Sequence, residues 1–434
     1  MRAMLAGHPA LTETDFNTLA ATTLARCDAL AACTDELSRI TRTFLSPGME
    51  KSHRLVREWM KAAGMTVAVD RAGNLRGCYA ASSEPGPRLI IASHLDTVPN
   101  AGHYDGVLGV MLGIALVEAL AGRRLGFGIE VIGFSDEEGV RYDLPFIGSR
   151  AATSTLLAPH LARKDAAGVA LYAALDTFHA AHPDAIDPVL DPSARAYLEF
   201  HIEQGPVLEH AGLSLGTVET IAGQTRATII FRGRSGHAGT TPMFLRHDAL
   251  AAAAEWVSGV ESAASSMPGL VATTGRISCE PDAANVIPGL VRCSLDVRNA
   301  DDAIRRAAVG NFLRTAEVIG KRRGIEVEHV IEFEQLAVGL DGRLVSLADQ
   351  ALSDIGISPR HVTSGAGHDA MIVAPHIPSV MIFLRSPGGI SHHPDEAVYA
   401  QDVAAALRAG LRFLEIFEAS LGQFGESERR SCTI

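Results

Sequence analysis

The sequence lacks the features that mark nucleic-acid-binding, membrane and secreted proteins. It carries a net charge of −12 and has no run rich in lysine and arginine, so we expect no nucleic-acid partner. No long uncharged apolar stretch is present that could span a bilayer, so we expect no membrane partner. Met1–Glu13 shows no basic segment followed by an apolar core, and we therefore expect no signal peptide and a cytoplasmic location.

Cysteine is also scarce, with 6 residues in 434, and no two of them form a CxxC pair. A chain of this length does not need disulfide bonds to fold, so we expect reduced thiols in a cytoplasmic protein. Internal repeats and low-complexity tracts are absent as well. The chain is too long for one hydrophobic core, and at least two domains are expected.

Hydrophobic patterns predict alternating strands and helices in the first half of the chain. Residues 88–92 and 129–134 are continuous apolar runs typical of buried strands, and residues 107–120 are typical of an apolar helix. Two further helices are expected at 14–40 and 50–63. Buried strands that alternate with helices indicate an α/β fold with a mostly parallel mixed sheet, in which ligands bind at the carboxyl ends of strands.

A different pattern begins near Leu213 and predicts an inserted domain. Its strands and helices follow the ferredoxin-like order β-α-β-β-α-β. The strands are expected at 216–221, 225–231, 271–279, 291–297 and 326–333, and the helices at 248–262 and 300–321. The α/β pattern then returns, with a strand at 379–384 and a helix at 400–420. We therefore predict a first domain in two parts, 1–212 and 331–434, and an inserted domain at 213–330.

Histidine and acidic residues gather where predicted strands give way to loops. The blocks that contain them are Ser93–Pro99, Tyr104–Gly106, Ser135–Gly139, His201–Gly205 and Gly389–Pro394. Two metal ions that share a carboxylate can generate hydroxide from water at neutral pH and polarise a carbonyl group at the same time. We therefore interpret these blocks as one dinuclear metal site and the chain as a hydrolase.

Each block has an ordinary explanation when it is taken alone. Asp96 can support the histidine two residues before it, but an isolated pair of this kind is more often a turn. Asp105 has an ordinary role as a helix N-cap, and His201, taken alone, is more often a buried core histidine. Glu137 and Glu138 point in different directions, so that one can bind metal while the other acts as general base, although such a stretch is usually a solvated loop. The joint occurrence of the blocks at successive strand ends favours the metal site.

Eight motifs occur in the order of one known family: SHLDTVPNAGHYDG, DEEG, HIEQGPVLE, GHAGTTPM, ANVIP, LDVR, GAGHDA and GGISHHPDE. Through these motifs the chain resembles the M20 metallopeptidase superfamily from about Arg57 to Phe413, and within it the hydantoinase/carbamoylase (amidase) branch. The resemblance implies a zinc-exopeptidase-like catalytic domain and an inserted α+β, ferredoxin-like lid domain that mediates dimerisation. His201 favours this branch, because many M20 peptidases have Asp in the corresponding place.

The resemblance also implies two sets of metal ligands that share one carboxylate. The first set is His94, Asp105 and His201, and the second is Asp105, Glu138 and His392. The implied cofactors are two divalent metal ions per subunit, zinc or manganese, which suit mixed imidazole and carboxylate ligands. Glu137 is implied to be the general base, and Asp96 to orient His94. One of the adjacent His392 and His393 suffices as a ligand, and the resemblance implies His392.

Further polar residues are implied to contact the substrate. His237 is implied to reach the active site of a partner subunit and to stabilise a tetrahedral oxyanion, which requires a homodimer. The implied substrate-binding residues are Gln204, Asn285, Arg298 and His368. Arg298 suits a bidentate grip on a carboxylate, with a surface salt bridge as its alternative role. The alternative for His368 is a position at a helix start without substrate contact.

Together, these implied roles describe a metal-dependent amidohydrolase that cleaves a ureido or carbamoyl C–N bond of a small carboxylate substrate. Allantoate, with release of ammonia and carbon dioxide, is the expected substrate, because GAGHDA, GGISHHPDE and Ile221–Arg226 look like allantoate amidohydrolases. The alternative is an N-carbamoyl-L-amino acid hydrolase or a β-ureidopropionase. An M20 peptidase or deacylase ranks lower. An inactive metal-binding relative is disfavoured, because Glu137 and all the ligands are present.

Overall fold

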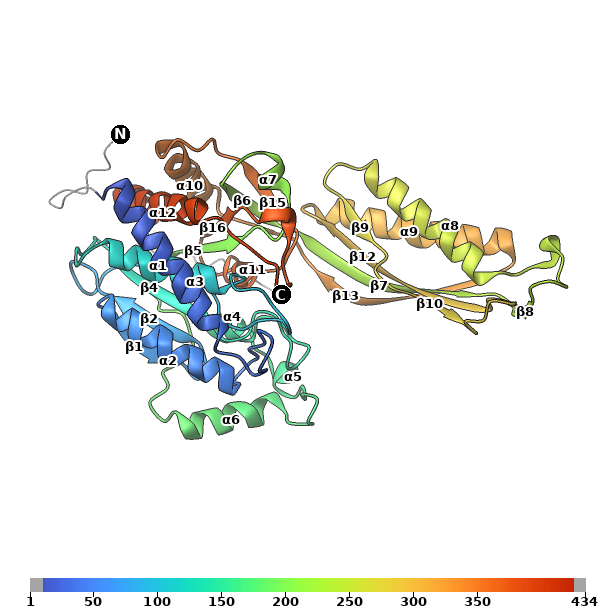
Figure 1. Ribbon diagram of the computed structural model, residues 1–434, viewed down its shortest axis with the longest axis horizontal. Coiled ribbons are helices and arrows are strands. Elements are labelled where there is room, and N and C mark those ends of the chain that lie inside the picture. The colour runs from blue at the N-terminus through green and yellow to red at the C-terminus, as the bar shows by residue number, and fades with distance from the viewer. Residues whose placement is uncertain (1–10, 425–434) are drawn as a thin grey trace. The chain divides into compact units, whose positions relative to one another are not determined.

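The computed structural model describes residues 11–424, which divide into two compact units (Figure 1). The first unit takes the described residues up to Glu219, together with Gly339–Val362 and those from Gly367 onward, and the second takes Thr220–Val338 with Thr363–Ala366. The second unit therefore begins after Leu213, where we placed the start of the insert. The reason is that strand β6 (Leu215–Ile221) pairs within the sheet of the first unit.

The first unit contains a nine-stranded mixed sheet with the order β1-β2-β4-β3-β5-β16-β6-β14, in which β15 also pairs with β6. Besides β6, its strands are β1 (Thr66–Val69), β2 (Leu75–Tyr79), β3 (Arg88–His94), β4 (Gly128–Phe134), β5 (Ala194–Ile202), β14 (Val338–Gly339), β15 (His361–Ser364) and β16 (Ser379–Leu384). The central strands β4, β3, β5 and β16 are parallel neighbours, and β1, β2 and β6 pair antiparallel. The predicted fold class is confirmed.

Helices surround this sheet, and several of them share one hydrophobic core with its strands. The helices of the unit are α1 (Glu13–Ala31), α2 (Pro47–Ala62), α3 (Val107–Ala119), α4 (Ile147–Ala152), α5 (Ala158–Leu161), α6 (Leu171–Ala181), α7 (Val207–His210), α10 (Gly342–Asp354), α11 (Asp369–Val373) and α12 (Ala400–Ser420), with short 3-10 turns at Pro387–Gly389 and Leu421–Gln423. Helix α3 packs against β3 on one side and against α1 and α12 on the other, which explains why its sequence is apolar all round.

The helix that we predicted at 14–40 ends at Ala31. Beyond it, the buried Arg42 side chain donates to the carbonyl oxygens of Leu30 and Cys33, both at 2.9 Å. The chain therefore turns back on the helix end, and the guanidinium satisfies carbonyl groups that a helix C-terminus leaves unpaired. This prediction was wrong because the helix end is set by a residue beyond the helix in sequence.

The second unit is an antiparallel sheet with two helices on one face. Its strands are β7 (Gly223–Arg232), β9 (Val271–Thr273), β10 (Ile277–Glu280), β12 (Leu290–Asn299) and β13 (Glu326–Gln335), and its helices are α8 (Ala249–Ser265) and α9 (Asp302–Arg323). A 3-10 turn lies at Met243–Leu245. A separate two-stranded sheet is formed by β8 (Gly236–His237) and β11 (Val286–Ile287). The main order is β10-β12-β7-β13. Alternate residues of β12 are buried against the helices, as expected for a sheet with one covered face.

The described residues bear on two predictions, the absence of a membrane span and the presence of reduced thiols. Among the described residues, no helix combines the length and apolarity needed to cross a membrane. Five cysteines in the described range carry free thiols, whereas Cys432 lies outside the described residues.

Candidate metal centre

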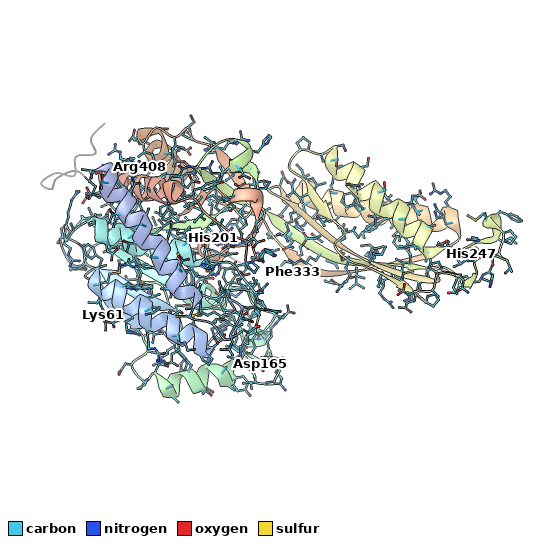
Figure 2. All side chains as sticks on the ribbon, in the orientation of Figure 1. Lys61, Asp165, His201, His247, Phe333 and Arg408 are labelled. Atoms are coloured by element: carbon cyan, nitrogen blue, oxygen red, sulfur yellow. The ribbon has the colours of Figure 1, made fainter. Side chains whose placement is uncertain are left out.

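The residues of the predicted metal site lie at one edge of the large sheet. His94 is the last residue of β3, Glu137 and Glu138 follow β4, and His201 is near the end of β5. His392 lies in the loop that follows β16. Because β4, β3, β5 and β16 are adjacent and parallel, their carboxyl ends meet at the same edge. Figure 2 shows His201 among closely packed side chains, with Lys61, Asp165 and Arg408 toward the periphery of the unit.

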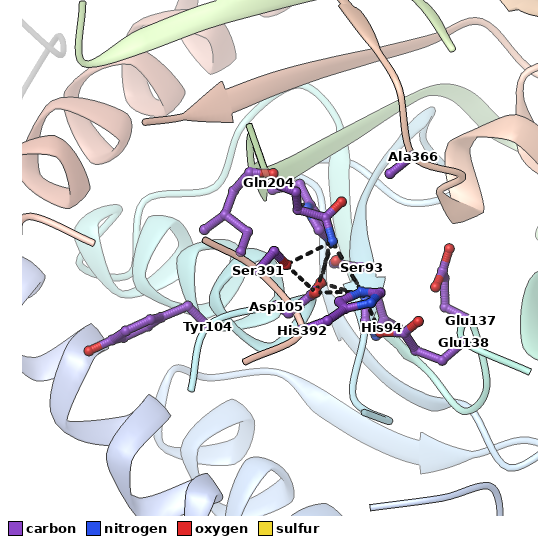
Figure 3. Close-up of polar contacts among 12 residues, drawn as sticks. Ser93, His94, Tyr104, Asp105, Glu137, Glu138, Gln204, Ala366, Ser391 and His392 are labelled. Carbon is purple, nitrogen blue, oxygen red and sulfur yellow. Dashed lines mark hydrogen bonds and ion pairs between the residues drawn. The ribbon is translucent and has the colours of Figure 1, made fainter. Parts of the chain in front are cut away.

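Asp105 lies at the centre of this cluster and is buried, with an exposed fraction of 4%. Its Oδ1 lies 3.2 Å from His201 Nε2 and 3.5 Å from His94 Nε2. Its Oδ2 lies 3.1 Å from His392 Nε2, which is also 3.3 Å from Glu138 Oε1. Oδ1 therefore faces the imidazoles of His94 and His201, whereas Oδ2 faces that of His392. Figure 3 shows Gln204, Ser391 and His392 directed toward Asp105.

The imidazoles of His94 and His201 are oriented by backbone carbonyl groups. His94 Nδ1 lies 3.0 Å from the carbonyl oxygen of Asp96, and His201 Nδ1 lies 2.9 Å from the carbonyl oxygen of Ile202. A carbonyl oxygen only accepts hydrogen bonds, so each Nδ1 carries the proton. In the neutral tautomer this leaves the lone pair of Nε2 free to bind a metal ion.

The electrostatics of the cluster favour positive charge beside Asp105. Burial would raise the pKa of the Asp105 carboxyl, but hydrogen bonds with His201, His392 and His94 hold it well below its usual value. Burial would likewise lower the pKa of His94, but contacts with Asp105 and Asp96 raise it well above its usual value. Hydrogen bonds to Asp105 and Glu138 raise the pKa of His392 to about 10, against the effect of burial. A divalent cation carries the same sign of charge as these protonated imidazoles.

The donor set fits metal binding. Within the described residues, three groups of side chains bring one ligand atom each within 4.8 Å of one another, and two of the groups share Asp105: His94, Asp105 and His201; Asp105, Glu138 and His392; and His94, Glu137 and Glu138. The first two groups are the ligand sets implied by the resemblance. Imidazole nitrogen with carboxylate oxygen is a donor combination that suits zinc and manganese.

Asp96 lies beside His94 and also contacts the loop that follows β4. We expected its carboxylate to orient His94, yet the nearer contact to His94 Nδ1 is the backbone carbonyl, and the carboxylate oxygen is 3.4 Å away. The carboxylate also accepts the backbone N–H groups of Glu137 and Glu138, at 2.9 and 3.1 Å. Asp96 therefore joins the end of β3 to the loop after β4. Glu137 itself is buried, and burial together with the charge of Glu138 raises its pKa well above its usual value.

Of the two adjacent histidines, His392 is the one that meets the cluster. The side chain of His393 is 58% exposed, and its Nδ1 accepts the backbone N–H of Asp395 at 3.2 Å. His392 has a φ of 55° and Gln204 a φ of 59°, a left-handed backbone that is uncommon for residues other than glycine. Both side chains lie against Asp105, and strained backbone at such positions is typical of functional sites.

Two predicted substrate-binding residues are in the first unit. Gln204 Nε2 donates to Asp105 Oδ2 at 2.9 Å and to Ser391 Oγ at 3.1 Å (Figure 3). His368 is buried at the start of α11, with its ring centroid 4.4 Å from that of His201, and burial lowers its pKa well below its usual value. Gln204 therefore contacts the shared carboxylate itself, whereas His368 packs behind a predicted ligand.

The other predicted residues belong to the second unit. His237 and Asn285 are exposed and adjacent, because β8 pairs with β11 and Ala238 N–H donates to the Asn285 carbonyl oxygen at 3.0 Å. Arg298, near the end of β12, makes two hydrogen bonds to Asp296, at 2.9 and 3.0 Å, and one to the Gly365 carbonyl oxygen at 2.6 Å. The salt bridge that we considered as its alternative role is thus present, and it engages three of the five guanidinium N–H groups.

Sequence reasoning missed several polar residues around the centre. Glu199 is fully buried inside β5, where it accepts from Tyr197 Oη at 2.9 Å, Ser93 Oγ at 3.3 Å and Ala370 N–H at 3.1 Å. An acidic residue within an apolar strand is a signal that could have identified it. Glu396, the last residue of the motif GGISHHPDE, is also buried beside the centre.

A parallel sheet edge that carries imidazoles and carboxylates around one shared Asp defines a class of metal-binding α/β proteins. Residues 90–416 match the model of peptidase family M20/M25/M40. The chain is 38% identical over 427 residues to allantoate deiminase 1 of Glycine max, with 90% of this chain and 88% of the relative covered. It is 36% identical over 375 residues to the N-carbamoyl-L-amino acid amidohydrolase of Geobacillus stearothermophilus, with 84% and 90% covered.

A solved structure agrees with these matches. The crystal structure of an amidase of the hydantoinase/carbamoylase family from Burkholderia multivorans has a TM-score of 0.85 and 30% identity, with 92% of this chain and 97% of that chain covered. The chain belongs to peptidase family M20/M25/M40. The predicted family and its amidase branch are confirmed.

The contacts of Asp96 predict that the Asp96→Asn variant binds metal more weakly. An amide presents only one acceptor oxygen, so one of the two backbone N–H groups of Glu137 and Glu138 would face an NH₂ group. Loss of such a supporting contact typically lowers metal affinity by about 10–100-fold. Competition with a chromophoric chelator on the folded apoprotein measures the effect. Asp143→Asn, a change at a fully exposed carboxylate in the following loop, is the control, and wild-type affinity in Asp96→Asn would contradict the assignment.

Proposed function

We propose that this protein is an amidohydrolase that uses two divalent metal ions to cleave the ureido or carbamoyl C–N bond of a small carboxylate substrate, and that allantoate is this substrate. The observation that carries the proposal is the position of Asp105, whose two oxygens face separate imidazole sets as a bridging carboxylate requires. Relatives named allantoate deiminase, at 37–38% identity, support the choice of allantoate as the substrate.

We also propose that the protein acts in the cytoplasm, and the free thiols of its described cysteines support this.

In the proposed reaction, water adds to the carbamoyl carbon, the C–N bond to the leaving amine breaks, and the resulting carbamate decomposes to ammonia and carbon dioxide. Zinc or manganese ions, when bound by the two ligand sets, would acidify water and polarise the carbonyl group. Glu137 takes the proton from water and returns it to the leaving nitrogen. Burial and the charge of Glu138 raise the pKa of its carboxyl, which makes Glu137 a stronger base than an exposed glutamate.

The substrate carboxylate needs a local cation, because the net charge of −12 repels anions. Arg298 supplies it in our proposal. Asp296 and the Gly365 carbonyl hold its guanidinium in place and leave two N–H groups for a carboxylate. Asn285 and Gln204 are proposed to assist in binding, and His368 to support the pocket from behind His201.

The second candidate is hydrolysis of an N-carbamoyl-L-amino acid. It is favoured by relatives of that name at 35% and 36% identity. Both candidate substrates carry a carbamoyl group and a carboxylate, so the same residues serve either one. The difference between them lies in the group that is attached beside the carboxylate.

Ammonia release distinguishes these two functions. Apoprotein reloaded with zinc or manganese should hydrolyse allantoate with a higher kcat/KM than any of several N-carbamoyl-L-amino acids. Analogues in which the carboxylate is replaced by an amide should react far more slowly, because the Arg298 contact is lost. A higher kcat/KM for an N-carbamoyl-L-amino acid would select the second candidate, and hydrolysis of none of these substrates would reject the proposed function.

The Glu137→Gln variant is the control for this assay. Gln keeps the shape of the side chain but cannot accept the proton, so kcat should fall by about 10²–10⁴-fold while metal content is unchanged. Turnover near that of the wild type in a metal-replete Glu137→Gln preparation would show that another group is the base.

We also propose a homodimer formed through the inserted domain, in which His237 serves the partner subunit. Support comes from Met243, Phe244 and Leu245, which follow His237 in the same loop and have exposed fractions of 77%, 85% and 51%. Apolar side chains exposed together in this way are typical of a surface that another protein covers. His237 is itself exposed in that loop, which supports a role for it at the proposed subunit contact.

Mixed dimers provide the test of this arrangement. His237→Ala and Glu137→Gln chains should each be nearly inactive, whereas a heterodimer of the two should contain one site with both Glu137 and His237. Mixing them should therefore restore part of the activity, and mixing two batches of the same variant should not. If mass-labelled chains exchange subunits and no activity returns, His237 does not act across the interface.

A further inference from the structure

Glu396 is a buried carboxylate that bonds to the backbone of the predicted bridging ligand. Its exposed fraction is 5%, and it lies in the same loop as His392. Its Oε1 accepts the backbone N–H of Tyr104 at 2.8 Å and that of Asp105 at 3.0 Å. One carboxylate oxygen therefore holds two successive peptide groups of a loop that is nearly three hundred residues away in sequence.

Ser391 extends this contact to the side chain of Asp105. Its hydroxyl donates to Asp105 Oδ2 at 3.0 Å and lies 3.4 Å from Glu396 Oε2 (Figure 3 shows the Ser391 contact). A hydroxyl has one proton, and the shorter distance assigns it to Asp105. The loop after β16 thus reaches Asp105 three times, through His392 and Ser391 at the carboxylate and through Glu396 at the backbone.

The chain around Asp105 is shaped to admit these neighbours. A Cβ at Gly102 would overlap the Glu396 side chain, so glycine is needed for the loop to pass over this carboxylate. A Cβ at Gly106 would overlap the His94 ring, and Gly106 has a φ of 67°. The segment that carries Asp105 is therefore confined between Glu396 on one side and His94 on the other.

Burial of Glu396 has a cost that these contacts reduce but do not cancel: burial and the charge of Asp105 raise the pKa of its carboxyl to about 7, against the effect of the two backbone hydrogen bonds. Within the described part of the chain, no lysine, arginine or histidine forms an ion pair with it, although an unpaired buried carboxylate is strongly disfavoured. Glu396 also belongs to none of the groups of described residues that bring ligand atoms together for a metal ion. Its contacts serve the placement of Asp105 rather than ligation.

We propose that Glu396 is a positioning residue of the metal centre: it fixes the backbone of Asp105 and ties the loop of Asp105 to the loop of His392. The inference rests on the proposed dinuclear site. Without Glu396, the buried N–H group of Asp105 and the partly buried N–H group of Tyr104 lose their acceptor. The Asp105 carboxylate is then free to move, and the two ligand sets no longer share a fixed oxygen pair.

Metal affinity and the shape of the substituted side chain test this role. Glu396→Gln keeps an acceptor oxygen at the same length and should bind Mn²⁺ and Zn²⁺ as the wild type does. Glu396→Asp keeps the charge but is one methylene shorter, and Glu396→Ala removes the acceptor. Both should lower the affinity of the folded apoprotein by about 10–100-fold. The spin-coupled electron paramagnetic resonance signal of the Mn²⁺ pair, which depends on the shared carboxylate, should be lost in Glu396→Ala and kept in Glu396→Gln.

Asp395→Ala is the matched control, because Asp395 is in the same loop and its side chain is 77% exposed. It should leave metal affinity and the Mn²⁺ signal unchanged. If Glu396→Ala does not fold, the contrast between the Gln and Asp variants decides the question. Wild-type affinity in Glu396→Asp with weak binding in Glu396→Gln would show that charge, not position, matters and would overturn the inference. Wild-type protein that binds fewer than two ions would instead reject the proposed dinuclear site.

Discussion

The carboxylate of Asp105 is the group on which the rest of the centre depends. It is buried, and three imidazoles, one amide and one hydroxyl lie within 3.5 Å of its oxygens. A buried carboxylate is tolerated only when it is paired and hydrogen-bonded, and here each of its oxygens faces a different set of partners. The same division is what a carboxylate shared by the two proposed metal ions would require. Displacement of Asp105 would therefore disturb both ligand sets at once.

The parallel sheet fixes the positions of the side chains around Asp105. Strands β4, β3, β5 and β16 come from segments far apart in sequence, yet their carboxyl ends form one edge. The predicted ligands sit on strand ends or in short loops beside them, and backbone carbonyls hold the rings of His94 and His201. Rigid elements of this kind keep functional groups in place better than free loops do. The Asp105 and His392 loops are the exceptions, and contacts between the two loops compensate for this.

The sequence predicted the part of the site that follows from local pattern. His94, Glu137 and His201 were identified because apolar strands precede them and a parallel sheet brings strand ends together. Contacts between distant segments had no such signal. The end of α1 at Ala31 depends on Arg42, and the sheet to which β6 belongs depends on its pairing with β16. The residue type alone could not show that Asp96 would bind two peptide N–H groups, or that Arg298 would pair with Asp296.

Crystals of the manganese-loaded protein, with diffraction data collected on both sides of the manganese absorption edge, would show whether Asp105 joins two metal ions. We expect two anomalous peaks about 3.5–4 Å apart, one beside His94 and His201 and the other beside Glu138 and His392, with one oxygen of Asp105 bound to each. A single peak in fully active protein, or two peaks with Asp105 bound to neither, would contradict this expectation.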